Sequence, residues 1–185
     1  MTNPSEPGTV AILGADTLGA RFAVAALRAG YRTILEDFRF DVLERASLGV
    51  REALATMDAR ERLGVARTVE DACRQADFVI DTTVDDAELK LEIFTLLDKF
   101  ALPGAVCATV AASIAIAELG AITYRPELCV GLRLQSVGPD AELLTVVRAT
   151  QTSEETVRAC LDFARRVQWR SAVESEAVPP AALLS

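Results

Sequence analysis

Histidine is absent from this chain of 185 residues. The imidazole ring is the side chain that changes charge near neutral pH, the commonest metal ligand and a frequent general base. Without it the chain can form no Ser-His-Asp triad, no Cys-His pair and no histidine-ligated metal centre. We therefore expect no metal cofactor.

Cysteine is sparse, and its four positions contain no C-x-x-C pair. A zinc knuckle or a thiol redox motif requires such a pair, so the sequence excludes both. We interpret the cysteines as free, buried thiols in a reducing cytosol; they are Cys73, Cys107, Cys129 and Cys160.

Basic segments and long apolar runs are also missing. The 27 Asp and Glu residues exceed the 19 Lys and Arg residues, which argues against nucleic acid and anionic membranes as partners. The N-terminal MTNPSEPGT lacks the basic and apolar segments of a signal peptide. The least polar run, 101–117, is interrupted by Pro103-Gly104, and a membrane helix needs about 20 apolar residues. The sequence predicts a soluble, cytoplasmic protein.

Short apolar segments alternate with amphipathic ones along the chain. We predict strands at 10–13, 33–35, 77–81, 105–109, 129–134, 143–147 and 171–173. Helical patterns cover 17–29, 86–100, 113–119 and 153–167, with a long amphipathic stretch at 41–62 and a helix start at Thr68. We interpret Thr68 and Ser113 as N-caps. This alternation predicts an α/β fold: a Rossmann-like, doubly wound, mainly parallel sheet with helices on both faces.

A glycine turn follows the first predicted strand and opens the first helix. The segment Gly14-Ala-Asp16-Thr17-Leu18-Gly19 matches the G-x-G-x-x-G dinucleotide fingerprint except for Asp16 in the middle. Asp37 ends the second strand 18 residues after Gly19, near the usual place of the acid that binds the adenosine ribose. We predict a flexible N-terminus (1–8), a dinucleotide-binding domain (9–175) and a C-terminal tail (176–185).

The aspartate in the fingerprint has two interpretations. Glycine at this position lets the backbone approach the pyrophosphate. A carboxylate ~4 Å from a phosphate charge would cost about 4 kcal/mol at a dielectric constant of 20, which weakens binding roughly a thousandfold. NAD would then bind, but weakly. Alternatively, the Asp16 carboxylate caps the helix N-terminus and itself occupies the anion site.

Five stretches of the chain resemble the N-terminal, NAD-binding domain of the 3-hydroxyacyl-CoA dehydrogenases. They are GADTLGARFA, ADFVIDTTVDDAELK, IAELGAITYRPE, VGLRL and LLTVVRATQTSEETV, and they keep the family's order from Val10 to Val173. The resemblance implies a Rossmann fold and NAD as cofactor. In the family a helical domain follows, contributes to dimerisation and closes the substrate cleft; the present sequence stops before it.

The resemblance breaks down at the family's catalytic residues. The catalytic histidine falls on Arg133, the glutamate that orients it on Thr145, and the catalytic serine on Ala112, next to Ser113. A guanidinium is never deprotonated in proteins, so Arg133 cannot accept the hydroxyl proton. Thr145 cannot stabilise a cation as a carboxylate does. We therefore expect no catalytic residues of the family type.

The family's E-N-x-x-x-K segment falls on the residues from Asp85 to Lys90. The resemblance places Asp85 and Lys90 near the nicotinamide half of the cofactor. A plain helix start explains them equally well, with Asp85 and Asp86 complementing the helix dipole and Lys90 solvated. Both interpretations stay open.

Three functions are compatible with these observations. The first is a degenerate dehydrogenase-like domain, a pseudoenzyme, that binds a small molecule or a protein partner. The second is an enzyme that uses the same cleft, either an NAD-dependent oxidoreductase with altered residues or a non-redox catalyst; its candidates are Asp81, Asp85, Lys90, Tyr124 and Arg133. The third is a true NAD-dependent hydroxyacyl dehydrogenase.

Two of these candidates have simpler explanations. Tyr124 precedes a proline turn, and we interpret it as a packing residue. Arg133 either holds a carboxylate or phosphate of a ligand or forms an ion pair within the domain.

Apolar surface that a second domain would cover must be polar, be covered by the tail, or join another subunit. The composition, 51% apolar, and the apolar tail Pro179-Pro-Ala-Ala-Leu-Leu favour the last two possibilities. We therefore predict a homodimer or a hetero-complex.

Overall fold

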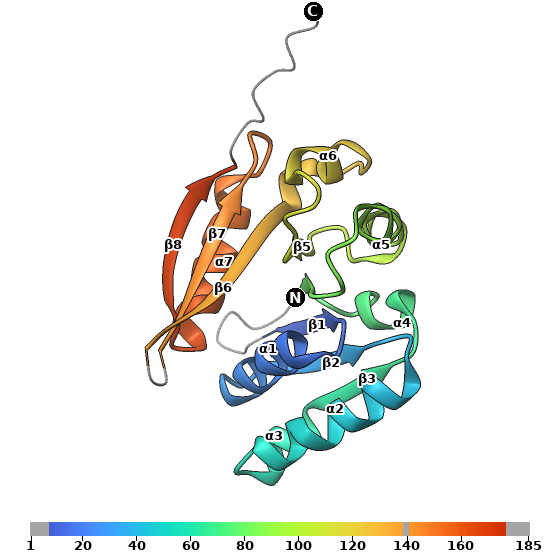
Figure 1. Ribbon diagram of the computed structural model, residues 1–185, viewed down its shortest axis with the longest axis vertical. Coiled ribbons are helices and arrows are strands. Elements are labelled where there is room, and N and C mark those ends of the chain that lie inside the picture. The colour runs from blue at the N-terminus through green and yellow to red at the C-terminus, as the bar shows by residue number, and fades with distance from the viewer. Residues whose placement is uncertain (1–7, 139–140, 177–185) are drawn as a thin grey trace, which may run out of the picture.

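The computed structural model describes residues 8–138 and 141–176, which form one eight-stranded sheet with helices on both faces (Figure 1). In the order in which they lie side by side, the strands are β3 (Leu63–Ala66), β2 (Arg32–Glu36), β1 (Thr9–Leu13), β4 (Phe78–Asp81), β5 (Val106–Thr109), β6 (Cys129–Gly138), β7 (Ala141–Arg148) and β8 (Arg170–Ser175). All neighbours pair in parallel except β6 and β7. The predicted mainly parallel, doubly wound α/β sheet is confirmed.

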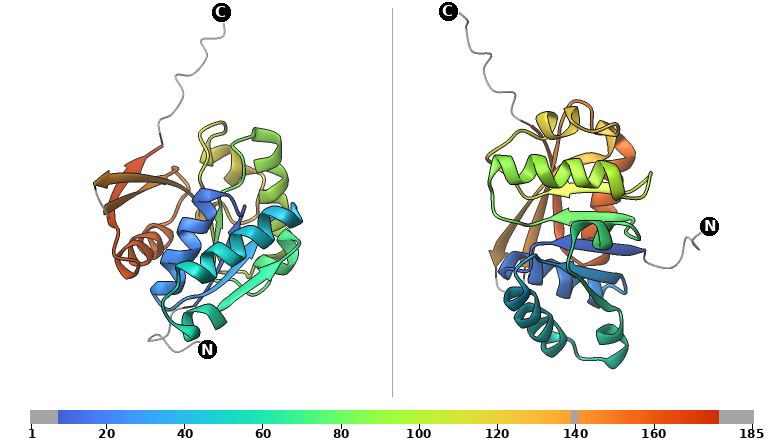
Figure 2. Two further views of the ribbon diagram at one scale, coloured as in Figure 1. Left: turned by 60° about the horizontal axis from the view of Figure 1, so that its bottom comes forward. Right: turned by 90° about the vertical axis from the view of Figure 1, so that its right-hand side faces the viewer.

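Two layers of helices bury the apolar faces of the sheet. One layer contains α1 (Thr17–Arg28), α2 (Phe40–Ala53), α3 (Met57–Glu61) and α7 (Glu154–Arg166). The opposite layer contains α4 (Val69–Cys73), α5 (Ala87–Phe100) and α6 (Ile116–Ala121), and a short 3₁₀ turn (Pro126–Leu128) leads into β6. In the right-hand view of Figure 2, α5 lies in front of the sheet.

Aromatic rings anchor α7 to the first layer. Phe163 of α7 stacks on Phe78 of β4 with ring centroids 5.5 Å apart. Trp169, which follows α7, meets Phe22 of α1 edge-on at 5.2 Å. Offset and edge-on pairs of this kind add about 0.5–1.5 kcal/mol to the burial of the rings. The C-terminal part of the described chain is thereby held against α1 and β4.

Local hydrogen bonds confirm several predicted helix starts. The Thr68 hydroxyl accepts the N–H of Asp71 at 3.1 Å, and the Ser153 hydroxyl accepts the N–H of Thr156 at 3.1 Å. Asp86 caps α5 in the same way by accepting the N–H of Leu89. Each cap satisfies a backbone donor that the helix itself leaves unpaired.

The structure differs from the predicted elements in three places. The stretch 41–62 divides into α2 and α3, because Leu54 turns into extended backbone and Thr56 caps a new helix. Strand β3 was not predicted, since its four residues, LGVA, are too few to show a period. The predicted cap Ser113 also fails: α6 begins at Ile116, and the Ser113 hydroxyl bonds to Asp85.

The predicted free, buried thiols are confirmed. All four cysteines are unpaired and buried. Burial raises the pKa of the Cys107 and Cys160 thiols to about 12, so neither forms the reactive thiolate at neutral pH. The apolar segment 179–184 lies outside the described residues. Within the described ranges, no helix has both the length and the apolarity to cross a membrane.

Glu36 is a buried carboxyl at the end of β2, only 4% exposed. It pairs in register with Leu13 of β1, which in turn pairs with Asp81 of β4. Burial is the main cause that raises the pKa of Glu36 from 4.5 to about 7, and the nearby charges of Asp37 and Asp81 contribute to the same rise. The fold therefore favours the protonated form of Glu36.

The substitution Glu36→Gln should remove this pH dependence. Because the folded-state pKa of Glu36 is raised, the natural protein loses stability as pH rises from about 4.5 to 7, by up to about 3 kcal/mol. The variant should match the natural protein near pH 4.5 and exceed it above pH 7. Urea unfolding at a series of pH values measures the difference. A difference that is constant with pH would contradict the assignment.

Candidate functional site

The glycine turn between β1 and α1 is built by close backbone contacts. Gly14 has a φ of +91°, and a Cβ there would lie 2.9 Å from the amide nitrogen of Thr83. A Cβ on Gly19 would come within 1.9 Å of the Gly14 carbonyl oxygen. The Thr82 hydroxyl closes the turn by donating to the Leu13 carbonyl at 2.9 Å. The backbone itself therefore requires glycine at both positions.

This turn lies at the topological switch point of the sheet. Chain connections run one way from β1 to β2 and β3, and the other way from β4 to β5. Open α/β sheets bind ligands in the crevice at this point, beyond the carboxyl ends of the strands. Thr17 and Leu18 form the first turn of α1 there.

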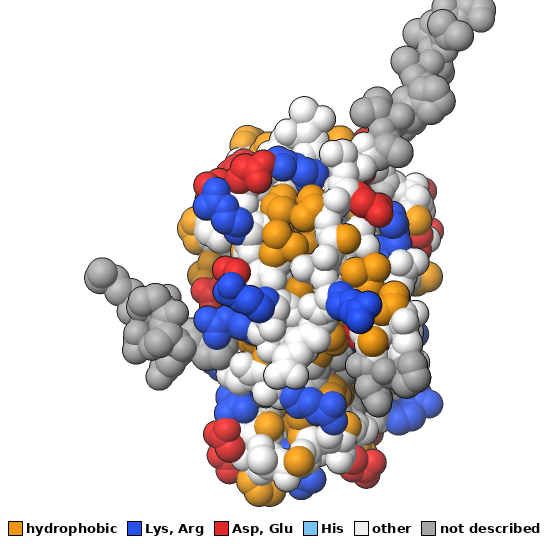
Figure 3. Space-filling view, turned by 90° about the vertical axis from the view of Figure 1, so that its left-hand side faces the viewer, with side chains coloured by type: hydrophobic (Ala, Val, Ile, Leu, Met, Phe, Trp, Pro, Cys, Tyr) orange, Lys and Arg blue, Asp and Glu red, His pale blue; other side chains and the backbone are white. Residues whose placement is uncertain are grey.

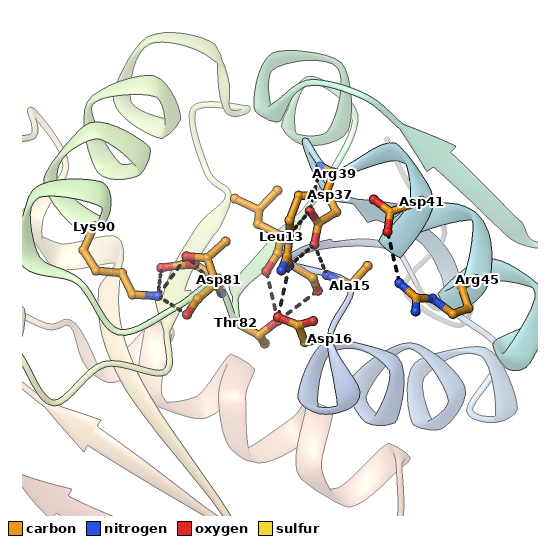
Figure 4. A network of polar contacts seen from close by, with 12 residues as sticks. Leu13, Ala15, Asp16, Asp37, Arg39, Asp41, Arg45, Asp81, Thr82 and Lys90 are labelled. Carbon is orange, nitrogen blue, oxygen red and sulfur yellow. Dashed lines mark hydrogen bonds and ion pairs between the residues drawn. The ribbon is translucent and has the colours of Figure 1, made fainter.

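Of the two interpretations of Asp16, the one in which its carboxylate caps α1 was wrong. Asp16 occupies the N-cap position, but its side chain accepts no hydrogen bond from the helix backbone. Its Oδ2 atom instead lies 3.0 Å from Nη2 of Arg39 (Figure 4). A guanidinium from the loop after β2 has drawn the carboxylate away from the helix. The helix N-terminus thus keeps its N–H donors at the place where fingerprint helices bind pyrophosphate.

Asp37 lies at the end of β2, as predicted, but its carboxylate is already bonded. It accepts the N–H of Ala15 at 2.9 Å and three further bonds from the backbone N, Nε and Nη2 of Arg39 at 2.8–2.9 Å. Its side chain is only 2% exposed. Burial alone would raise the pKa of Asp37, but the bonds from Arg39 and Ala15 outweigh it and hold the pKa below the ordinary value.

These bonds decide what Asp37 can do for a ligand. A carboxylate offers about four acceptor positions, and here all are used within the protein. The ribose hydroxyls of a dinucleotide would reach Asp37 only if Arg39 moved. No sequence pattern pointed to Arg39, although it stands two residues after the predicted ribose-binding acid.

Lys90 is completely buried, so the expectation that it is solvated was wrong. Its Nζ lies 2.8 Å from Oδ2 of Asp81, 3.0 Å from the Thr83 carbonyl and 3.1 Å from the Thr83 hydroxyl (Figure 4). Asp81 also accepts the hydroxyl of Thr109 at 2.7 Å. The three protons of the ammonium group are therefore all engaged. Lys90 holds the Thr83 loop in place and presents no free charge to the cleft.

Asp85 connects two loops at the rim of the cleft. Its carboxylate accepts the N–H groups of Ala112 and Ser113 at 3.0–3.1 Å and the Ser113 hydroxyl at 2.7 Å. Burial raises the pKa of Asp85, but the bonds from Ser113 and Ala112 outweigh this and lower it overall. Asp85 therefore stays ionised and fixes the loop before α6.

A cleft of about 810 Å³ opens at this edge of the sheet. Residues from the loops after β4 and β5, from the helices α1 and α6 and from the strands β6 and β7 line it, together with Glu176 after β8; they include Leu18, Thr83, Asp85, Ala112, Ser113 and Arg133. The Glu176 carboxylate accepts the N–H groups of Ile116 and, at 3.0 Å, Ala117 at the start of α6. No sequence pattern pointed to Glu176, because this contact joins segments about 60 residues apart.

The positions matched to the family's catalytic residues come together here. Arg133 of β6 lies directly opposite Thr145 of β7 in the antiparallel ladder, and Arg133 and Ala112 line the same cleft. Nη1 of Arg133 lies 3.1 Å from Oε2 of Glu174 on β8. Of the two interpretations of Arg133, the structure supports the ion pair within the domain.

Tyr124 does not belong to this group, and the prediction that it packs was wrong. Its side chain is 97% exposed, and its backbone N–H donates to Asp98 near the end of α5. It is not among the residues that line the cleft. Within the part of the chain that the structure describes, no group of His, Cys, Asp and Glu side chains could hold a metal ion.

The substitution Lys90→Met should lower the free energy of unfolding by about 3–5 kcal/mol, because it leaves the Asp81 charge buried without a counter-ion. The matched control is Lys99→Met, an exposed lysine on the same helix, which should change it by less than about 0.5 kcal/mol. Urea unfolding measures both. An equal, small effect of the two substitutions would show that the buried pair does not stabilise the fold.

Comparison with known proteins supports the family suggested by the sequence. The family model described as 3-hydroxyacyl-CoA dehydrogenase, NAD binding domain, matches residues 9–177. A probable 3-hydroxybutyryl-CoA dehydrogenase of Bacillus subtilis is 27% identical over 92% of this chain and 63% of its own length. The mitochondrial hydroxyacyl-coenzyme A dehydrogenase of Mus musculus is also 27% identical, over 84% of this chain and 55% of the mouse protein.

Solved structures of this family have the same fold as this chain. The crystal structure of 3-hydroxybutyryl-CoA dehydrogenase from Escherichia coli superposes with a TM-score of 0.84 at 25% identity, over 92% of this chain and 38% of that one. The chain thus spans less than two thirds of these relatives. Because the family model covers nearly all of the described residues, this chain belongs to the family of 3-hydroxyacyl-CoA dehydrogenase NAD-binding domains.

Proposed function

We propose that this chain binds an adenine dinucleotide in the cleft at the switch point and does not oxidise 3-hydroxyacyl substrates by a histidine-based mechanism. The observation that carries the proposal is the Arg133–Glu174 ion pair, which stands opposite Thr145 where a catalytic histidine and glutamate would face each other. A guanidinium only donates hydrogen bonds and cannot accept a proton. Hydride removal from a hydroxyl needs a base for the hydroxyl proton.

Three features of the turn support dinucleotide binding. Gly14 and Gly19 keep the backbone close to the α1 N-terminus, that N-terminus carries no side-chain cap, and the turn opens at the switch point of the sheet. A pyrophosphate would accept hydrogen bonds from the free N–H groups of α1. When bound, the nicotinamide ring supplies or accepts a hydride.

Asp16 weakens this site less than its charge alone suggests. The Arg39 guanidinium, 3.0 Å from the Asp16 carboxylate, offsets part of the repulsion that a phosphate would meet. The Asp16 side chain is 59% exposed, so solvent screens the rest. We infer that NAD(H) binding is weakened by Asp16 and not abolished.

The second candidate function, catalysis by other residues of the cleft, has less support. Asp81 and Lys90 neutralise each other in a buried pair. Asp85 has a lowered pKa and is bonded to the loop before α6, which makes it a poor general base near neutral pH. The hydroxyl groups beside carboxylates at this cleft, those of Thr83 and Ser113, donate hydrogen bonds to Asp81 and Asp85.

Calorimetric titration with NADH and NADPH tests the binding part of the proposal. The natural chain should bind at least one of them, and Asp16→Gly should bind it about tenfold more tightly, because a carboxylate no longer faces the pyrophosphate. Asp16→Asn separates the charge from the size of the side chain. No detectable binding by the natural chain or by Asp16→Gly would refute the proposal.

Absorbance at the NADH wavelength tests the catalytic part. With NAD⁺ or NADP⁺ and 3-hydroxybutyryl-CoA, the chain should produce no reduced cofactor. The control Arg133→Gln should leave this result unchanged, since no base is removed. Turnover by the natural chain that disappears in an Asp37 variant would overturn the proposal.

We also propose that the chain forms a homodimer or a hetero-complex. Exposed apolar side chains near the β6–β8 end of the sheet include Val137 and Val173, each nearly half exposed. On the side where β8 forms the sheet edge, Figure 3 shows hydrophobic side chains in small groups among charged ones. Light scattering over a wide range of concentration should give a mass above that of one chain. A single-chain mass throughout would contradict self-association.

A further inference from the structure

Two arginines and two exposed phenylalanines gather at the carboxyl ends of β2 and β3. Phe38 is 78% exposed and Phe40 is 56% exposed, although aromatic rings of this size are usually well buried. The guanidinium of Arg39 lies over the Phe38 ring at 5.6 Å, and that of Arg67 lies over the Phe40 ring at 4.9 Å. Each of these exposed rings thus has a guanidinium group over it, at the edge of the sheet where β2 and β3 end.

Recognition of a free ribose needs an acceptor that this site does not offer. In NAD-binding folds the acid at the end of the second strand accepts the ribose hydroxyls, whereas a nearby arginine accommodates a 2′-phosphate in NADP-binding folds. Here Asp37 has its acceptor positions filled by Ala15 and Arg39. Arg39 is 40% exposed, and among the described residues its Nη1 has no hydrogen-bond partner.

Arg67 supplies a second cation at the same edge. Glu36 pairs in register with Ala66 in the parallel ladder of β2 and β3. The residues that follow them, Asp37 and Arg67, therefore leave adjacent strands, which lie about 4.8 Å apart. Arg67 takes part in none of the ion pairs between described residues, in contrast to Arg39.

The arginine side chains at this edge can attract an anion. Asp16 and Asp37 share Arg39 as their counter-ion, and Arg67 adds a positive charge with no acidic partner among the described residues. Guanidinium groups bind phosphate through paired N–H donors. The exposed rings of Phe38 and Phe40 add aromatic surface beside these guanidinium groups.

We infer that the edge of the sheet at the carboxyl ends of β2 and β3 recognises a ribose that carries a phosphate, as in NADP(H), in preference to the free hydroxyls of NAD(H), with Arg39 and Arg67 as the residues that determine this specificity. The inference rests on the proposed binding of an adenine dinucleotide. Phosphorylated adenosine also occurs in coenzyme A, whose phosphate is on the 3′ position. Direct titration with each compound separates the two sources.

Titration of the natural chain with NADPH, NADH, 2′,5′-ADP, 5′-ADP and coenzyme A tests the inference. NADPH should bind at least tenfold more tightly than NADH, and 2′,5′-ADP more tightly than 5′-ADP. Arg67→Gln should weaken NADPH about tenfold and leave NADH unchanged. Arg39→Gln should weaken NADPH and strengthen NADH, because it frees the Asp37 carboxylate for the ribose hydroxyls.

The matched control is Arg45→Gln, which removes an exposed arginine of α2 that pairs with Asp41. Its ratio of NADPH to NADH affinity should equal that of the natural chain. If coenzyme A binds more tightly than both dinucleotides, the site recognises a phosphorylated ribose, but the phosphate it recognises is the 3′-phosphate of coenzyme A. This result would overturn the assignment to NADP(H). NADH binding as tightly as NADPH would overturn the inference and leave the proposed function standing. Binding of none of these compounds would overturn both.

Discussion

The buried ion pair between Asp81 and Lys90 is the interaction on which the carboxyl edge of this sheet depends. Both side chains are fully buried, and a charge in a protein interior is tolerable only when its remaining hydrogen-bonding positions are filled. Thr83 and Thr109 fill them. The same bonds join β4, β5 and α5, and they set the loop against which the Gly14 turn packs. The ion pair therefore holds the Thr83 loop that lines the cleft.

Two glycines of the dinucleotide fingerprint are required by the packing of the backbone, independently of any ligand. Gly14 and Gly19 cannot carry a Cβ because of contacts within the protein, so the fold keeps them whatever the cofactor. The middle position has no such restriction, and Asp16 stands there with its side chain turned to Arg39. Replacement of the middle glycine thus changes the chemistry of the site while the turn keeps its geometry.

The same separation of geometry from chemistry appears at the far side of the cleft. Strands β6 and β7 still bring Arg133 and Thr145 face to face, as a sheet register does for any pair of residues at these positions. The side chains have changed, and Arg133 now pairs with Glu174 on β8. Family membership therefore follows from the scaffold, whereas activity depends on the particular residues placed on it.

The sequence by itself determined the fold class, most element positions and the exclusion of histidine chemistry. These follow from local information: apolar periodicity, and caps such as Thr68 that act over three residues. Only the tertiary structure decided the state of the charged residues. Asp16 could bond to the helix N-terminus or to Arg39, and it bonds to Arg39. Lys90 could be solvated or pair with Asp81, and it pairs with Asp81. Such choices depend on distances between segments far apart in the chain and on burial, neither of which a local pattern contains.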